Sequence, residues 1–131
     1  MSTAWLAAGS SKDSEVLPAW TTWSVGTSIS VAGSGPIPHG ATITEVALVV
    51  SASSGVTAIT LWLSHDAAGL LPLSPFAPDT ATQTLSDLGG GVGAVVFQLD
   101  ALYCKQDGLY VHARADAGDF TAHPQVYAEL P

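Results

Sequence analysis

Positive charge is scarce in this chain of 131 residues, which has 3 Lys and Arg residues against 11 Asp and Glu residues. The formal net charge of -8 provides no basic surface to neutralise phosphates, which excludes nucleic-acid binding as a function class. Charged residues of both signs make up 11% of the chain, compared with about a quarter in an average soluble domain. So little charge is expected where much of the surface contacts other proteins, although a neutral Ser and Thr surface would also be soluble.

Cysteine and asparagine are nearly or completely missing. The single Cys104 excludes an internal disulfide framework and a cysteine-rich zinc site, and the lack of Asn removes any N-glycosylation acceptor. No apolar run approaches the roughly 20 residues that span a bilayer, and the first residues lack the basic and apolar regions of a signal peptide. We therefore expect a protein that is made in a cytoplasm and has no membrane partner.

Short stretches rich in Val, Ile, Thr and aromatic residues recur along the chain, separated by turns of Gly, Pro and Asp. The predicted strands are, in order, 20–31, 42–53, 58–65, a short edge strand near 80–85, 92–99, 109–115 and 120–130. Pro124 implies an edge or a bulge in the last strand. Helical periodicity is limited to one turn near 100–105. This pattern predicts an all-β fold, an antiparallel β-sandwich with jelly-roll-like topology.

The first 19 residues show no strand-like alternation. They are predicted to form an extended N-terminal arm that packs on the body or on a neighbouring subunit. Trp5, Trp20 and Trp23 lie in or near this arm, and tryptophans inserted into a neighbour would anchor an assembly. Residues 20–131 are then a single β-sandwich domain within a chain long enough to bury a core without disulfides.

Sequence motifs for catalysis are weak. The Gly-rich run at 89–93 lacks the Gly-Lys-Ser/Thr ending of a phosphate loop, and no Gly-x-Ser-x-Gly sequence is present. His112 and His123 could meet across paired strands, but two imidazoles without a third ligand make a weak metal site. We predict no catalytic residue, metal or cofactor, and keep a metal-dependent jelly-roll enzyme as a third hypothesis.

Side-chain alternation directs a set of aromatic and hydrogen-bonding residues away from the core-facing side of the predicted strands. The set consists of Trp62, Tyr110, His112, Arg114, His123, Gln125 and Tyr127. On an exposed sheet face they could form the centre of a protein interface or stack on sugar rings. Alternatively a loop, such as 70–91 or the N-terminal arm, covers that face and buries them. The sequence leaves these three interpretations open.

Two segments carry a resemblance to a known class of proteins: 58–65 (AITLWLSH) and 108–115 (GLYVHARA). With the low charge and the abundant Ala, Gly, Ser and Thr, residues 20–131 resemble in texture the small β-sandwich virion proteins of tailed bacteriophages. These include head decoration (cement) proteins and tail-associated jelly rolls. The resemblance transfers no site residue, because it rests on texture rather than on a motif.

The resemblance implies a non-enzymatic structural subunit located in a virion. Such a subunit would be a homo-oligomer, with a trimer favoured, and would bind the major capsid protein or another virion protein so as to bridge and stabilise neighbouring subunits. An extended arm that reaches a neighbour would suit this role. The alternative is a carbohydrate-binding module or a tail or fibre adhesin, in which Trp62, Tyr110 and Tyr127 stack on a glycan.

Overall fold

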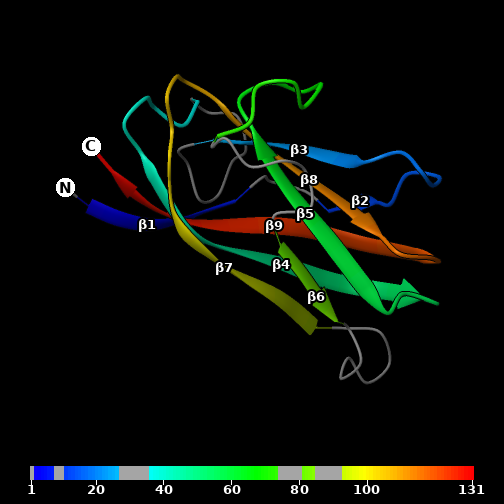
Figure 1. The fold of residues 1–131 in the computed structure, drawn as a ribbon. Helices are drawn as coiled ribbons and strands as arrows, with labels where there is room; N and C mark the ends of the chain where they lie inside the picture. Colours follow the sequence, from blue (N-terminus) through cyan, green and yellow to red (C-terminus); the bar gives the residue numbers. More distant parts are fainter. Residues whose placement is uncertain (1, 8–10, 27–35, 74–80, 85–92) are drawn as a thin grey trace.

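The fold is a sandwich of two antiparallel β-sheets packed face to face (Figure 1). A computed structural model describes residues 2–7, 11–26, 36–73, 81–84 and 93–131. Sheet A consists of β1 (Ser2–Ala7), β2 (Lys12–Asp13), β4 (Thr42–Ser54), β7 (Gly93–Tyr103) and β9 (Asp119–Leu130). Sheet B consists of β3 (Thr21–Val25), β5 (Ala58–Ser64), β6 (Ala81–Thr84) and β8 (Leu109–Ala115). The predicted all-β sandwich is confirmed.

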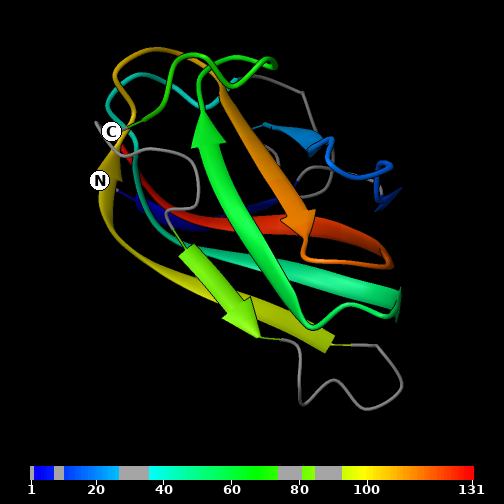
Figure 2. The same cartoon turned by 45° about the vertical axis from the view of Figure 1, so that its right-hand side comes forward.

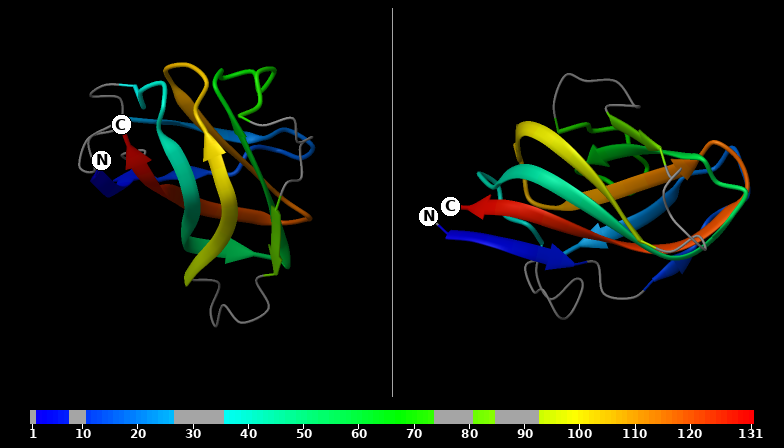
Figure 3. Two further views of the ribbon diagram at one scale, coloured as in Figure 1. Left: turned by 60° about the vertical axis from the view of Figure 1, so that its left-hand side comes forward. Right: turned by 90° about the horizontal axis from the view of Figure 1, so that it is seen from below.

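The order of strands in the two sheets is that of a jelly roll. Sheet A has the order β1-β9-β4-β7, with β2 also pairing β9, and sheet B has the order β3-β8-β5-β6. Consecutive strands cross from one sheet to the other except at β1–β2 and β5–β6. The last strand, β9, lies beside the first strand, β1, in sheet A (Figure 2). Ser2 is paired with Leu130, which brings the two ends of the chain together (Figure 3). This arrangement confirms the predicted topology.

Most predicted strands agree with the structure. The bounds of β8 match the prediction, β6 lies at an edge of sheet B, and β3 begins one residue after the predicted start. Residues 27–31 of the first predicted strand lie outside the described residues. The helical turn expected near 100–105 is wrong, because β7 continues to Tyr103 through Ala101, which has a φ of 42°.

The N-terminal segment, predicted as an extended arm without strand-like alternation, contains two short strands. Residues 2–7 form β1 and residues 12–13 form β2, and both pair with β9 at the edge of sheet A. The segment therefore lies on the body of its own chain, one of the two locations expected for the arm. The segment forms strands despite its weak alternation, because the backbone of β9 is available for pairing on the side away from β4.

Pro124 lies on β9 between the stretch that pairs with β1 and the stretch that pairs with β2. The last pair of β1 is Ala7 with Gln125, and the first pair of β2 is Lys12 with Ala122. On its other side β9 pairs with β4 without a register shift from Glu45 to Val50, and Pro124 faces Leu48 within that stretch. Because the strand beside β9 is interrupted at Pro124, its missing N–H is tolerated there, in agreement with the predicted local edge.

The core is formed by the inward side chains of both sheets. Trp23 is its largest member and is 1% exposed, and Phe97 is completely buried. Leu48 and Val126 from sheet A and Leu61 from sheet B are buried with them. Complete burial of such side chains is worth roughly 1.5–3 kcal/mol each, which makes the contact between the two sheets the main source of stability.

One end of the sandwich is held by Asp116 in the turn between β8 and β9. Its Oδ1 accepts hydrogen bonds from the backbone N–H groups of Thr57 and Ala58, at 3.1 Å each, and its Oδ2 accepts one from the Thr57 hydroxyl. These donors lower the pKa of Asp116 to about 2. The carboxylate therefore joins the β4–β5 turn to the β8–β9 turn.

Candidate interaction surface

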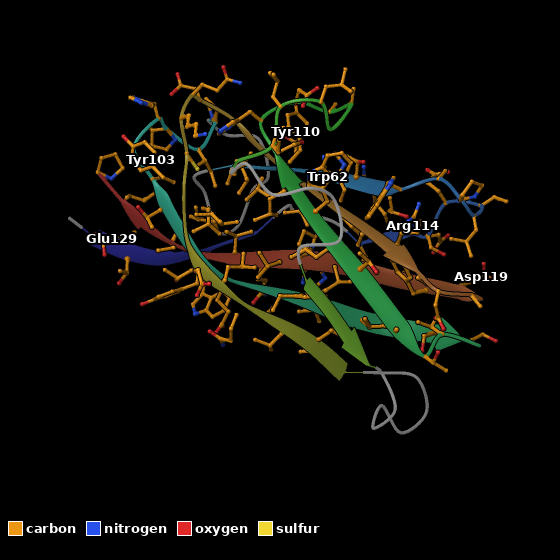
Figure 4. All side chains as sticks on the ribbon, viewed as in Figure 1. Trp62, Tyr103, Tyr110, Arg114, Asp119 and Glu129 are labelled. Carbon is orange, nitrogen blue, oxygen red and sulfur yellow. The ribbon has the colours of Figure 1, made fainter. Side chains whose placement is uncertain are left out.

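The predicted aromatic and polar face is divided between the two sheets. Trp62 lies on β5 and Tyr110, His112 and Arg114 lie on β8, all in sheet B. His123, Gln125 and Tyr127 lie on β9 of sheet A. Because the two sheets pack through their inner faces, the outer faces point in opposite directions (Figure 4). The prediction of a single face was wrong, since alternation gives the side of a strand but not its sheet.

The same division separates His112 from His123. β8 pairs with β3 and β5, whereas β9 pairs with β1, β2 and β4, so the two imidazoles do not meet across paired strands as expected. Within the ranges that the structure describes, no three His, Cys, Asp or Glu side chains gather in a way that could hold a metal ion. Cys104 is buried, and desolvation raises the pKa of its thiol to about 11.

His112 is the centre of a hydrogen-bond network on the outer side of sheet B. Its Nδ1 lies 2.8 Å from the Thr22 hydroxyl, and its Nε2 lies 2.7 Å from the Ser64 hydroxyl. Ser64 donates its own proton to the carbonyl of Asp66 at 2.6 Å, so its oxygen accepts from His112. Burial lowers the pKa of His112 and favours the neutral imidazole, in which the proton is on Nε2 and Nδ1 accepts from Thr22.

This arrangement differs from a catalytic serine–histidine pair. A nucleophilic serine donates its proton to histidine and is accessible to substrate. Ser64 donates to a backbone carbonyl instead and is 0% exposed. Burial lowers the pKa of His112, while the nearby carboxylate of Asp66 acts in the opposite direction. The pair therefore stabilises the sheet rather than presenting a nucleophile.

The segment before β3 covers part of this outer face. The rings of Trp20 and Trp62 meet edge to face, with centroids 5.8 Å apart. The Arg114 guanidinium carbon lies 4.4 Å from the centroid of the Trp20 ring, and its Nη1 donates to the carbonyl of Pro18 at 3.2 Å. The N-terminal segment thus contributes the intrachain cover that was one of the three interpretations of the sequence.

A second segment, the loop after β5, covers the other end of the same face. Gly69 has a φ of 74° and lies against the Trp62 ring, where a Cβ atom would be 3.5 Å from two of its carbons. Asp66 holds the loop by accepting hydrogen bonds from Leu70 at 3.1 Å and Leu71 at 2.9 Å. Desolvation would raise the pKa of Asp66, but these N–H donors outweigh it and lower the pKa. Trp62 is therefore half-buried between two loops.

These two covering segments expose large apolar side chains to solvent. Val16 is 87% exposed and Leu17 38% in the first segment, and Leu70 is 77% and Leu71 50% exposed in the second. We call these four residues the apolar rim of sheet B. These four residues were not predicted from the sequence, although apolar residues beside proline and glycine turns were a signal that could have found them. Thr22 and Ser64 were predicted as strand residues, but no role was predicted for them.

The outer face of sheet A carries a different aromatic arrangement. Trp5 on β1 pairs with Tyr127 on β9, with ring centroids 5.0 Å apart and planes at 50°. The same row continues through Glu45 on β4 to Gln98 on β7, and Gln98 donates a hydrogen bond to the Glu45 carboxylate. Both aromatic rings are half-buried. This face therefore presents an aromatic pair beside planar polar groups.

The three tryptophans expected to anchor an arm have three different environments. Trp5 lies on the outer side of sheet A and Trp20 on the outer side of sheet B. Trp23 is 1% exposed in the core, where it is paired with Val111 of β8, so its assignment as an arm anchor was wrong. Odd residues of β3 point inward, and position 23 follows that alternation.

Similarity to known proteins gives no further guide to the site. No protein-family model matches the chain, and no curated protein is similar to it. The part of the chain that the structure describes contains no helix long and apolar enough to cross a membrane.

Proposed function

We propose that this protein is a non-enzymatic structural subunit of a virion, a capsid decoration protein that contacts neighbouring proteins through the outer side of sheet B. The observation that carries the proposal is the apolar rim. Isolated apolar residues on a surface are ordinary, but large ones gathered around one face are typical of interaction sites. Val16 and Leu70 are the two most exposed large hydrophobic residues among the described side chains, and they belong to the two segments that contact Trp62 through Trp20 and Gly69.

Burial energetics support this role for the rim. Covering a fully exposed Val or Leu side chain is worth roughly 1.5–3 kcal/mol, so the rim could supply much of the affinity of an ordinary interface. A standard interface buries about 1,600 Å² in total, and such contacts become strong when a lattice repeats them. The covered tryptophans beneath the rim would serve as a rigid support, since the hydrogen bonds and rings around Trp62 fix both loops.

The placement of charge also favours protein contact at the sheet faces. Most of the described charged residues lie in β2 and in the turns at the two ends of the sandwich. On sheet B, Arg114 is already paired with Trp20 and with the Pro18 carbonyl. A partner that docks there buries few unpaired charges, so the desolvation cost of the contact is low.

The test is the solution mass of the protein and of charged rim variants, measured by light scattering at micromolar concentration. We expect the wild type to be an oligomer, a trimer by the resemblance, and Val16→Glu/Leu70→Glu to lower its mass. Val96→Glu is the control, because Val96 is an exposed hydrophobic residue on sheet A, although its exposed fraction of 38% is lower than those of Val16 and Leu70. A monomeric wild type, or rim variants with unchanged mass, would contradict self-association through the rim.

Glycan binding is the second candidate, and the Trp5–Tyr127 pair on sheet A favours it. The platform expected at Trp62 is covered by Trp20 and Gly69, whereas Trp5 and Tyr127 lie beside the polar groups of Glu45 and Gln98. Aromatic faces next to planar polar side chains suit sugar rings. The candidate predicts signals on a glycan array that Tyr127→Ala removes and Trp62→Phe retains. An array without signals would count against it.

A further inference from the structure

Within the part of the chain that the structure describes, the edge formed by β1 has none of the features that usually protect a sheet edge. β1 is the terminal strand of sheet A, and none of the described residues pairs with it on the side away from β9. Its sequence, STAWLA, contains no charge and no proline. Natural edge strands avoid unwanted pairing through charges, prolines, bulges or covering segments, because their unpaired backbone groups recruit other strands.

The other edges of the sandwich carry such protection. β2 continues the same edge with the charged residues Lys12 and Asp13. On sheet B, the edge of β3 is covered because the Lys12 ammonium donates to the carbonyl of Thr22 at 2.6 Å. β7 carries the left-handed Ala101, and its pairing with β4 is irregular between Ile43 and Glu45. β6 and β7 contact each other where the two sheets meet. β6 (ATQT) is uncharged as well, but its contact with β7 distinguishes it from β1.

We propose that β1 pairs antiparallel with β1 of a second copy of this chain, which joins the two A sheets across a two-fold axis. A second copy fits this edge because it offers the same uncharged strand already folded, so no ordering entropy is lost on pairing. An antiparallel pair of identical strands is an isologous contact, which closes at two copies. The proposal concerns a surface different from the apolar rim and stands independently of it.

Electrostatics permit the contact despite the net charge of -8. The nearest carboxylate on the outer face is that of Glu129, which is paired with Thr3 from the neighbouring strand β9. In the joined sheet the two β9 strands lie three strand spacings apart, about 14 Å. This separation exceeds the Debye length of about 8 Å at physiological salt, so repulsion between the two Glu129 residues is largely screened.

Trp5 supplies side-chain contacts to the same pairing. It lies near the middle of β1, and its ring already packs against Tyr127 on the outer face. A two-fold axis perpendicular to the sheet places both copies of Trp5 on the same face and within cross-strand reach. Aromatic cross-strand pairs contribute roughly 0.2–1 kcal/mol beyond the backbone hydrogen bonds. The joined sheets would then carry a continuous row of aromatic rings.

The decisive experiment compares Thr3→Lys with Ser24→Lys by sedimentation equilibrium. Both substitutions replace a small, exposed hydroxyl residue on an edge strand, Thr3 on β1 and Ser24 on β3. We expect Thr3→Lys to weaken self-association about tenfold or more and Ser24→Lys to leave it unchanged, with both variants melting like the wild type. Wild-type association that Thr3→Lys does not alter would overturn the proposal, as would a strictly monomeric wild type.

The variants also separate this proposal from that of the apolar rim. If Val16→Glu/Leu70→Glu lowers the mass and Thr3→Lys does not, the rim proposal stands and the β1 proposal fails. If Thr3→Lys lowers the mass and Val16→Glu/Leu70→Glu does not, only the rim proposal fails, because the two surfaces share no residue. A wild type that is monomeric at every concentration fails both.

A distance measurement identifies the strands that pair. Cys104 is buried and is not expected to react, so Thr3→Cys and Ser24→Cys can each be labelled at a single site with a nitroxide. Pairing centred on β1 places the two Thr3 Cα atoms within about 15 Å, and dipolar coupling between copies should be strong for Thr3→Cys and weak for Ser24→Cys. Equal coupling at both sites would contradict the proposed contact. A dimer in which the two chains swap their β1 strands, recognised by a long distance between the two labels at position 3, would contradict it as well.

Discussion

The outer faces of sheets A and B have similar sequence patterns but different surroundings. On sheet B the chain covers its own residues: Trp20 packs on Trp62, and the Thr22 and Ser64 hydroxyls hold His112. On sheet A the residues stay half exposed, with Trp5 against Tyr127 as the main contact. The difference shows that alternation identifies outward positions, whereas segments remote in sequence decide whether those positions are available to a partner.

The two outward histidines illustrate this contrast. His112 is buried with both ring nitrogens hydrogen-bonded to hydroxyls. His123 is half-buried, and its Nδ1 lies 3.2 Å from the hydroxyl of Ser11. A polar group that is buried and satisfied becomes part of the structure, since removing either partner leaves the other without its bond. The outer side chains of sheet B therefore stabilise the fold, whereas those of sheet A remain accessible to a partner.

The largest expected effect is on the tryptophan that the loops cover. Trp62→Ala should lower the free energy of unfolding by about 3 kcal/mol, because it empties the space between Trp20 and Gly69. Tyr127→Ala, on the open face, should cost about 1 kcal/mol. Urea denaturation of both variants measures the difference.

A conservative variant makes this test sharper. The indole Nε1 of Trp62 is buried and has no hydrogen-bond partner among the described residues, so Trp62→Phe should retain most of the stability. Equal losses for Trp62→Ala and Tyr127→Ala would show that the two faces are equally open, contrary to the structure.

The next effect concerns the pH dependence of stability. Burial holds the pKa of His112 below its ordinary value of 6.5, so the unfolded chain binds a proton more readily than the folded one. Stability should therefore be complete above pH 6.5 and should fall as the pH decreases towards the folded pKa. Urea unfolding at pH 7.5 and pH 5.5 measures this loss. The slope should disappear in His112→Gln and persist in His123→Gln; a slope retained in His112→Gln would assign it to another group.

The smallest expected effect is on the segment that covers sheet B. Arg114→Gln removes the cation–π contact with Trp20 and the hydrogen bond to Pro18, and should cost about 1 kcal/mol. Gln125→Ala is the control on sheet A and should cost less than 0.5 kcal/mol. Faster amide exchange at Leu17, Ala19 and Trp20 in Arg114→Gln would locate the loss in the covering segment. Identical exchange in the variant and the wild type would contradict this role of Arg114.

Several features of the fold were predictable because they depend on local chemistry. Leu109, Val111, Ala113 and Ala115 alternate with polar residues, and β8 has the predicted bounds. The short edge strand predicted near 80–85 is present as β6 at the edge of sheet B. The N-terminal strands were missed because residues 1–19 have no clear alternation, and β1 forms through its backbone pairing with β9.

The candidate surface was less predictable. The outward direction of Trp62 and Tyr127 was correct, but the assignment to one face and the placement of Trp23 in an arm were not. The apolar rim was not foreseen, because exposure of Val16 and Leu70 depends on how two loops lie over Trp62. The alternation of side chains along a strand does not show which sheet the strand joins or how a loop lies over it.

The sequence by itself determined the all-β class and the inward and outward positions along each strand, since side-chain alternation and turn chemistry act between near neighbours. Its composition also determined the low content of charged residues. Only the tertiary structure decided which sheet each strand joins and which outer face is covered. The physical reason is that these outcomes depend on contacts between distant residues. Thr22 and His112, which hydrogen-bond across sheet B, are separated by 90 positions in the chain.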